Sequence, residues 1–134
     1  MNYNDYRREV YEDTIQYIKD CEYLNNFTDP DPDCRWEERE FYDMMDEVWL
    51  PVTGNDNGSY YCNSYKAKEA LKDAIFDTDI LTLLSGHEME DSFWGYMQEG
   101  DYEAADVIVR CAMFWEVESD VQAWIEEQIG RDLD

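Results

Sequence analysis

The chain has 134 residues, 44% of them hydrophobic and 16% aromatic, which predicts a single domain with a core of its own. Its 34 Asp and Glu against 10 Lys and Arg give a formal net charge of −24. The aromatic content excludes a disordered acidic tail, and the charge argues against direct binding to nucleic acid or to an anionic membrane.

The first predicted element is an amphipathic helix over residues 2–24. Its apolar face repeats every seven residues, at Tyr3, Val10, Tyr17 and Leu24. Three acids on another face follow i, i+4, i+8 spacing and form one row, with steps of about 6 Å along the helix axis: Asp5, Glu9 and Asp13. Because like charges at this spacing destabilise a helix by a few tenths of a kcal/mol per pair, the row suggests a role outside folding.

An acidic block follows over residues 29–47. Residues 25–34 predict a loop, because Pro30 and Pro32 exclude helix interior there. A second helix is expected from about Arg35 to Leu50, ended by Pro51. Nine acids stand against two arginines in this block, which is the densest charge of the chain: Asp29, Asp31, Asp33, Glu37, Glu38, Glu40, Asp43, Asp46 and Glu47.

A turn-rich connector over Val52–Tyr65 separates two helical parts. It is almost free of charge and holds two Gly and three Asn or Asp within residues 54–58. Residues 52–62 also fit a short β-hairpin. The prediction is one acidic domain with a helical N-terminal part (1–50), a turn (51–64) and a helical C-terminal part (65–134).

The C-terminal part predicts further helices with recognisable ends. One helix is expected to begin near Tyr65 and another after Ser119. Between them, helices are expected over Ile80–Leu84, over 88–98 and over 102–117. Gly86 and Gly100 are expected to end helices, and Asp77 or Asp79, Asp101 and Ser119 to cap them. The β-branched run Val107–Val109 also fits a strand, but the alanines around it favour helix. Together the elements predict a mainly α, compact fold of about five to six helices.

Two strings carry a resemblance to a known family: Val52–Tyr60 (VTGNDNGSY) and Ala105–Cys111 (ADVIVRC), with Tyr65–Glu69 between them. In these strings the chain resembles a family of small acidic, uncharacterised proteins encoded by phages and other mobile elements. The similarity covers about residues 48–117. The resemblance implies a mobile-element context and carries over no catalytic residues.

The motifs of catalysis and metal binding are weak. His87 is the only histidine and lies beside Gly86, where a surface role is expected, and the turn lacks the Lys-Ser/Thr of a phosphate loop. Asp29, Asp31, Asp33 and Glu40 fall at calcium-loop positions, but Cys34 replaces the required glycine. The four cysteines (Cys21, Cys34, Cys62 and Cys111) are scattered, which argues against structural zinc. We therefore expect no enzyme, no metal and no cofactor.

The lysines Lys66, Lys68 and Lys72 fall on one helical face. In isolation they would fit a phosphate site. In so acidic a chain, they are interpreted as ion-pair partners for the acids.

The leading functional hypothesis is mimicry of DNA. Proteins that bind DNA line their grooves with Lys and Arg, and rows of carboxylates on a rigid body offer such a groove a competing polyanion. The expected partner is the basic groove of a host nuclease: a CRISPR effector such as Cas9 first, then a restriction or DNA repair enzyme. The contact residues are predicted in the row Asp5, Glu9 and Asp13 and in the block Asp29–Glu47. The setting would be the host bacterial cytoplasm, since no export signal or membrane span is found.

Three alternatives stay open. The first is an accessory or structural phage protein whose acidity serves only solubility or a high-salt cytoplasm. The second is an enzyme that uses a carboxylate pair. Within the mimicry hypothesis, the Val52–Tyr65 turn is either a rigid joint or a contact surface.

Overall fold

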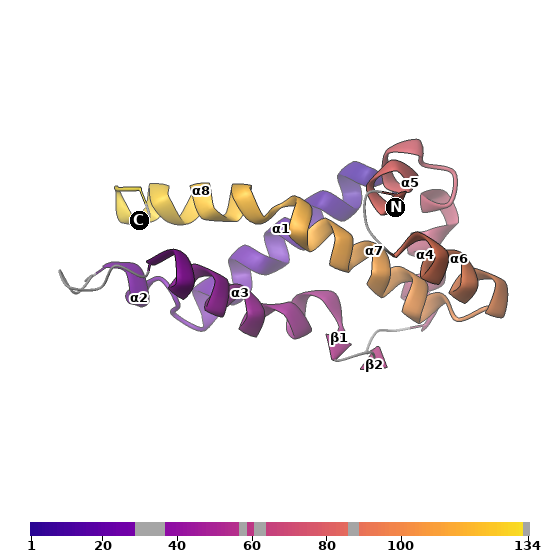
Figure 1. The fold of residues 1–134 in the computed structure, drawn as a ribbon, viewed down its shortest axis with the longest axis horizontal. Helices are drawn as coiled ribbons and strands as arrows, with labels where there is room; N and C mark the ends of the chain where they lie inside the picture. Colours follow the sequence, from indigo (N-terminus) through magenta and orange to yellow (C-terminus); the bar gives the residue numbers. More distant parts are fainter. Residues whose placement is uncertain (29–36, 57–58, 61–63, 86–88, 133–134) are drawn as a thin grey trace.

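In the computed structural model, residues 1–28, 37–56, 59–60, 64–85 and 89–132 are described (Figure 1). This part of the chain contains eight helices and two very short strands: α1 (Tyr3–Asp20), α2 (Asn25–Thr28), α3 (Glu37–Thr53), β1 (Asn55–Asp56), β2 (Ser59–Tyr60), α4 (Ser64–Ala74), α5 (Thr78–Ser85), α6 (Glu90–Glu99), α7 (Tyr102–Glu116) and α8 (Glu118–Ile129). The predicted mainly α fold is confirmed, although the helices outnumber the five to six expected.

Helix α7 is the centre of the fold. Every residue from 104 to 114 is buried, and nine of these eleven are apolar, as expected for a helix enclosed on all sides. Helices α1, α3, α4 and α6 all pack against α7, which crosses the middle of an elongated molecule (Figure 1). The β-branched run Val107–Val109 is therefore helical, as its alanine neighbours indicated.

Among the described residues, the predicted helix-end signals at Gly100, Asp101 and Asp77 are confirmed, whereas Gly86 lies outside the described residues. The Asp101 carboxylate accepts a hydrogen bond from the Ala104 amide at 3.3 Å, and Gly100 before it has φ of 76°. The Asp77 carboxylate accepts from the Asp79 amide at 2.9 Å. The predicted Ser119 cap is wrong: Val117 joins α7 to α8 in nearly helical conformation, so the first amides of α8 need no side-chain cap.

Removing the N-terminal cap of α7 tests how much this hydrogen bond contributes to the stability of the protein. We expect Asp101→Ala to lower the free energy of unfolding by about 1 kcal/mol, because the first amides of α7 lose their acceptor. Urea unfolding measures the change, with Asp132→Ala at an exposed position as the control. Equal stability of the two variants would contradict a capping role.

The first helix is shorter than predicted. It ends at Asp20 because Glu22 adopts φ of 57°, and the Tyr23 amide turns back to bond the Ile18 carbonyl at 3.1 Å. The short helix α2 then occupies the start of the predicted loop over 25–34. Its Phe27 is fully buried, which is the tertiary contact that the local sequence did not reveal.

Helix α3 continues through Pro51, which was predicted to end it. In the last helical turn a proline removes only one backbone hydrogen bond. The turn is completed by the Thr53 hydroxyl, which donates to the Trp49 carbonyl at 2.7 Å, and it ends at Gly54, with φ of 81°. The predicted hairpin over 52–62 is accordingly reduced to the two-residue strands β1 and β2, paired antiparallel.

Candidate functional site

A buried ionic network lies inside the central helix. Asp106 and Arg110 are only 2% and 7% exposed, one turn apart on α7. The Arg110 Nε donates to one Asp106 carboxylate oxygen at 2.9 Å, and the Tyr6 hydroxyl of α1 donates to the other at 2.6 Å. The guanidinium also lies 5.5 Å from the centre of the Tyr6 ring. Each buried charge is therefore paired and hydrogen-bonded, as burial requires.

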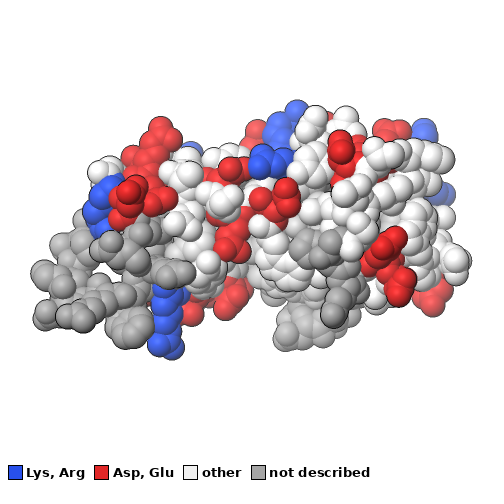
Figure 2. Space-filling model, turned by 45° about the horizontal axis from the view of Figure 1, so that its top comes forward, with Lys and Arg blue, Asp and Glu red and all other residues white. Residues whose placement is uncertain are grey.

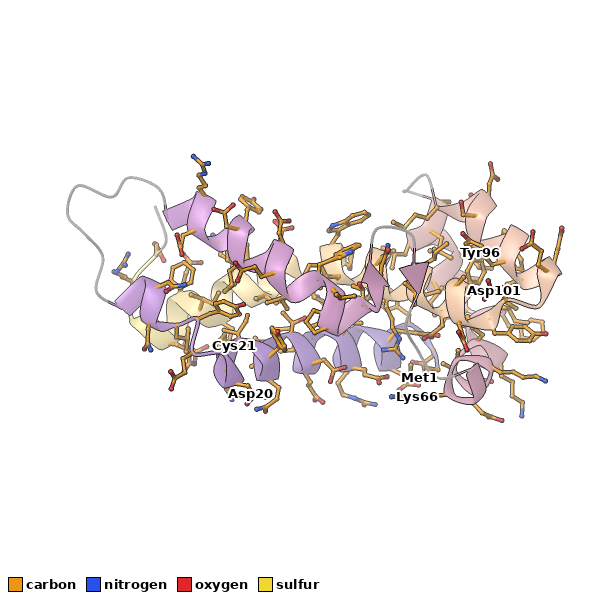
Figure 3. All side chains as sticks on the ribbon, turned by 90° about the horizontal axis from the view of Figure 1, so that it is seen from below. Met1, Asp20, Cys21, Lys66, Tyr96 and Asp101 are labelled. Atoms are coloured by element: carbon orange, nitrogen blue, oxygen red, sulfur yellow. The ribbon has the colours of Figure 1, made fainter. Side chains whose placement is uncertain are left out.

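Glu9 and Lys66 extend this network to the surface. One Glu9 carboxylate oxygen lies 3.6 Å from Arg110 and 3.3 Å from Lys66, which is the first lysine of α4 (Figure 3). Burial by itself lowers the pKa of Arg110, but the carboxylates of Asp106 and Glu9 raise that pKa above its ordinary value, so the guanidinium stays charged. Burial, followed by the Asp106 charge, likewise raises the pKa of Tyr6, which remains a neutral donor.

The ion-pair interpretation of the three lysines is confirmed for Lys66 only. Lys68 lies over the ring of Tyr102, 5.7 Å from its centre. Lys72 is exposed and makes no ion pair with a described residue.

The central turn packs on the same helix. The Asn55 side-chain amide donates to the Cys111 thiol at 3.6 Å, and Thr53 is 1% exposed. The two strings that carry the family resemblance thus meet in space, at the residue that follows Arg110. These contacts fix the start of the turn, at Thr53 and Asn55, against α7, and the interpretation of the whole turn as a rigid joint stays a prediction.

The reactivity of the Cys111 thiol shows whether the start of the turn stays packed on α7. Burial raises the pKa of its thiol, while hydrogen bonds from Asn55 and Thr53 act in the opposite direction. We expect iodoacetamide to leave Cys111 unmodified in the folded protein and to alkylate the exposed Cys21. Peptide mass spectrometry resolves the two, and alkylation of both at similar rates would show that the turn opens readily.

A surface groove of about 580 Å³ opens next to the network, where α1 meets the end of α3 and the start of α4. Its walls combine acidic, basic and apolar side chains: Glu9, Asp13, Leu50, Pro51, Val52, Thr53, Gly54, Lys66 and Arg110. The helices α1 and α3, which carry the predicted contact acids, run side by side here (Figure 3).

The three acids of the predicted row on α1 have different surroundings in the structure. Asp5 accepts a hydrogen bond from the Asn2 amide at 3.2 Å, as part of the helix cap, and pairs with Arg8 at 3.3 Å. Glu9 belongs to the ionic network. Asp13 is exposed and makes no ion pair with a described residue. Two members of the row therefore have structural partners, and Asp13 is the one left for an external contact.

The predicted acidic block is placed only from α3 onward. Asp29, Asp31 and Asp33 lie outside the described residues, as do Cys34, Cys62 and His87, and so does most of the tested calcium loop. Glu37 and Glu38 belong to the first turn of α3. The remaining four acids are exposed on α3: Glu40, Asp43, Asp46 and Glu47. Of these, Glu47 accepts a hydrogen bond from the Tyr23 hydroxyl at 2.7 Å.

The electrostatics of Asp13 give a testable consequence. Although its side chain is exposed on the whole, the Asp13 carboxylate is partly shielded from water by its neighbours. This partial burial, followed by the charge of Glu9, raises the pKa of Asp13 above 3.8, while the charges of Arg110 and Lys66 act in the opposite direction. Ionised Asp13 thus disfavours the folded state at neutral pH, and this penalty disappears as the pH falls through the folded-state pKa. We expect Asp13→Asn to stabilise the protein at pH 7 but not below pH 3.8, as measured by urea unfolding at both pH values. A loss of stability at pH 7 would contradict this.

The network was missed at the level of sequence, although its signal was present. Asp106 and Arg110 are opposite charges at i, i+4 spacing within a helix whose residues 104 to 114 are all buried. Two charges on the buried face of such a helix require each other or a partner. Within the described residues, no group of three or more His, Cys, Asp or Glu side chains is placed to hold a metal ion. None of the described helices is both long enough and apolar enough to cross a membrane.

The fold and the site define a small, mainly α-helical acidic protein with a buried ion-pair network and acidic outer helices. No family model matches the chain, and no curated protein or solved structure is significantly similar to it.

Proposed function

We propose that this protein is a DNA mimic, encoded by a phage or mobile element, that occupies the DNA-binding groove of a host nuclease. A CRISPR effector such as Cas9 is the first candidate, followed by a restriction or DNA repair enzyme. The mode of action is binding, without catalysis.

The observation that carries the proposal is the outer face of α3. Glu40, Asp43 and Asp46 are exposed and make no ion pair with any described residue. With Glu47 they place four carboxylates within about 10.5 Å of helix axis. A DNA strand carries one charge per about 3.4 Å of axis, so the charge density of this face is comparable.

A rigid support for these acids favours the same function. The inner face of α3 is held in the core by Phe41, Met44, Met45 and Val48, each less than 5% exposed. Carboxylates on so firmly packed a helix keep their spacing before binding. A partner therefore loses little conformational entropy in meeting them.

The second candidate is an accessory protein whose acidity serves solubility alone. The observation in its favour is that acidic side chains are scattered over the described part of the face shown in Figure 2, with basic ones between them. Charge that serves only solubility has no preferred location, whereas mimicry requires a particular face.

The test is capture from a bacterial lysate on the immobilised protein. Mimicry predicts that a nuclease or another DNA-binding protein is retained at low salt and is released both by added NaCl and by a duplex DNA oligonucleotide. Release by salt alone would favour non-specific charge attraction. If no DNA-binding protein is retained, the proposed function is wrong.

A further inference from the structure

The groove at the junction of α1 and α3 joins an apolar wall to an acidic one. The last turn of α3 forms the apolar wall, where Leu50 is 40% exposed and is followed by Pro51 and Val52. Helix α1 supplies Asp13 and, one turn before it, Glu9. The volume of about 580 Å³ falls in the range of about 300–1,000 Å³ typical of ligand sites.

The acids of this groove differ in what they already bind. Glu9 lies between Arg110 and Lys66, at 3.6 and 3.3 Å, and its charge is balanced within the protein. Asp13 makes no ion pair with a described residue; Arg110 and Lys66 act on its charge from farther away, but burial and the charge of Glu9 outweigh them. Asp13 lies beside a second carboxylate at the rim of an apolar surface, where an ionised group is poorly compensated.

We propose that this groove receives one Lys or Arg side chain of a protein partner, with its alkyl stem on Leu50 and Pro51 and its cationic head on Asp13. Long basic side chains cover apolar surface with their methylenes while the charged head reaches a polar group. The proposal rests on the proposed function and deepens it, because a basic DNA-binding groove is the surface that presents such side chains.

Asp13 favours this occupant over others, because Lys66 and Arg110, which also line the groove, are already paired with Glu9. An anion would meet Asp13 at close range and a protein of formal charge −24 beyond it. An apolar side chain would cover Leu50 but would take water away from Asp13 without replacing its hydrogen bonds, which costs free energy. A cation with an alkyl stem covers the apolar wall with its methylenes and pairs its charge with Asp13.

The higher pKa of Asp13 supports the same occupant. Its negative charge disfavours folding at neutral pH, and a bound cation offsets that cost. Asp13→Asn should therefore stabilise the free protein while it weakens the complex. A residue with a purely structural role would not show these opposite effects.

The test uses n-butylguanidinium chloride as the probe and amide chemical shifts of the full chain as the readout. We expect saturable shifts at Asp13, Leu50 and Gly54, an affinity about tenfold lower in Asp13→Asn, and no such loss in the control Glu99→Gln on the exposed end of α6. Neutral n-butanol and anionic n-butanesulfonate should not reproduce the shifts. Leu50→Ala should weaken the binding of n-butylguanidinium more than the binding of methylguanidinium, since only the longer probe has an alkyl stem to bury.

Two results would overturn the groove proposal: shifts of similar size at acids all over the surface, or equal binding of n-butanol. The same experiment separates this proposal from mimicry. If the lysate yields a DNA-binding partner whose affinity is unchanged by Asp13→Asn, the groove is wrong and mimicry stands. If the probe binds as expected but no DNA-binding protein is captured, mimicry is wrong and the groove remains a site for a basic side chain.

Discussion

Changing Asp43 and Asp46 together to lysine is expected to lower the affinity for the captured DNA-binding partner by about 100-fold or more. Close charge pairs across protein interfaces contribute about 1.5 kcal/mol each at the lower end of measured values. Two lost pairs then amount to about 3 kcal/mol, which corresponds to roughly 100-fold in affinity. Both side chains are exposed on α3, so the substitutions should leave the fold intact. Titration of the purified partner at fixed salt measures the change.

The matched control is Glu99→Lys with Asp132→Lys. Both double variants change the formal charge from −24 to −20, but the control acids are exposed on α6 and near the C-terminal end of α8. A role for the face of α3 predicts a large loss in the first variant and a small one in the second. Equal losses would show that only total charge matters, in favour of the solubility alternative.

Asp106→Ala is expected to destabilise the protein by about 3–5 kcal/mol. The substitution leaves the Arg110 guanidinium, only 7% exposed, without its main counter-charge, and it removes the acceptor of the Tyr6 hydroxyl. Breaking a buried ion pair on one side typically costs this much, because the remaining charge is uncompensated. Glu9 at 3.6 Å from Arg110 retains part of the pairing, which favours the lower end of the range. Urea unfolding measures this loss of unfolding free energy, provided that the dependence of the free energy on urea concentration has the same slope in both proteins.

The double variant Asp106→Leu with Arg110→Met provides the comparison. Well-packed apolar residues in place of a buried ion pair are often neutral or stabilising, so this variant should regain most of the stability lost in Asp106→Ala. If Asp106→Ala alone changes stability by less than about 1 kcal/mol, the network contributes little to the fold. Conformational specificity would then be its remaining role.

Local signals in the sequence predicted most of the helices, and the errors have tertiary causes. The charge of Asp101 and the flexibility of Gly100 mark a helix boundary without reference to the rest of the molecule. The short helix α2 exists because Phe27 is buried by distant parts of the chain. Pro51 is tolerated because the hydroxyl of Thr53 and the conformation of Gly54 complete the last turn of α3.

The candidate site was predicted less well than the fold. Helical spacing grouped Asp5, Glu9 and Asp13 into one row, which they form, but the spacing gave no information on their partners. The counter-charge of Glu9 comes from Lys66 and Arg110, which lie 57 and 101 positions further along the chain. Sequence periodicity describes one helix at a time. It therefore did not distinguish an acid held in a network from an acid left open at a groove.

The hydrogen bond between Tyr6 and Asp106 also has a consequence for synthesis on the ribosome. Its two residues are 100 positions apart, and Arg131 likewise bonds the Phe27 carbonyl across 104 positions. At typical translation rates of about 5–20 residues per second, α1 leaves the ribosome roughly 5–20 seconds before its partner on α7. During that interval α1 can pack against α3 but not against α7, so part of its apolar face stays uncovered. The nascent N-terminal half is thus the form of this protein most exposed to chaperones, proteases and aggregation.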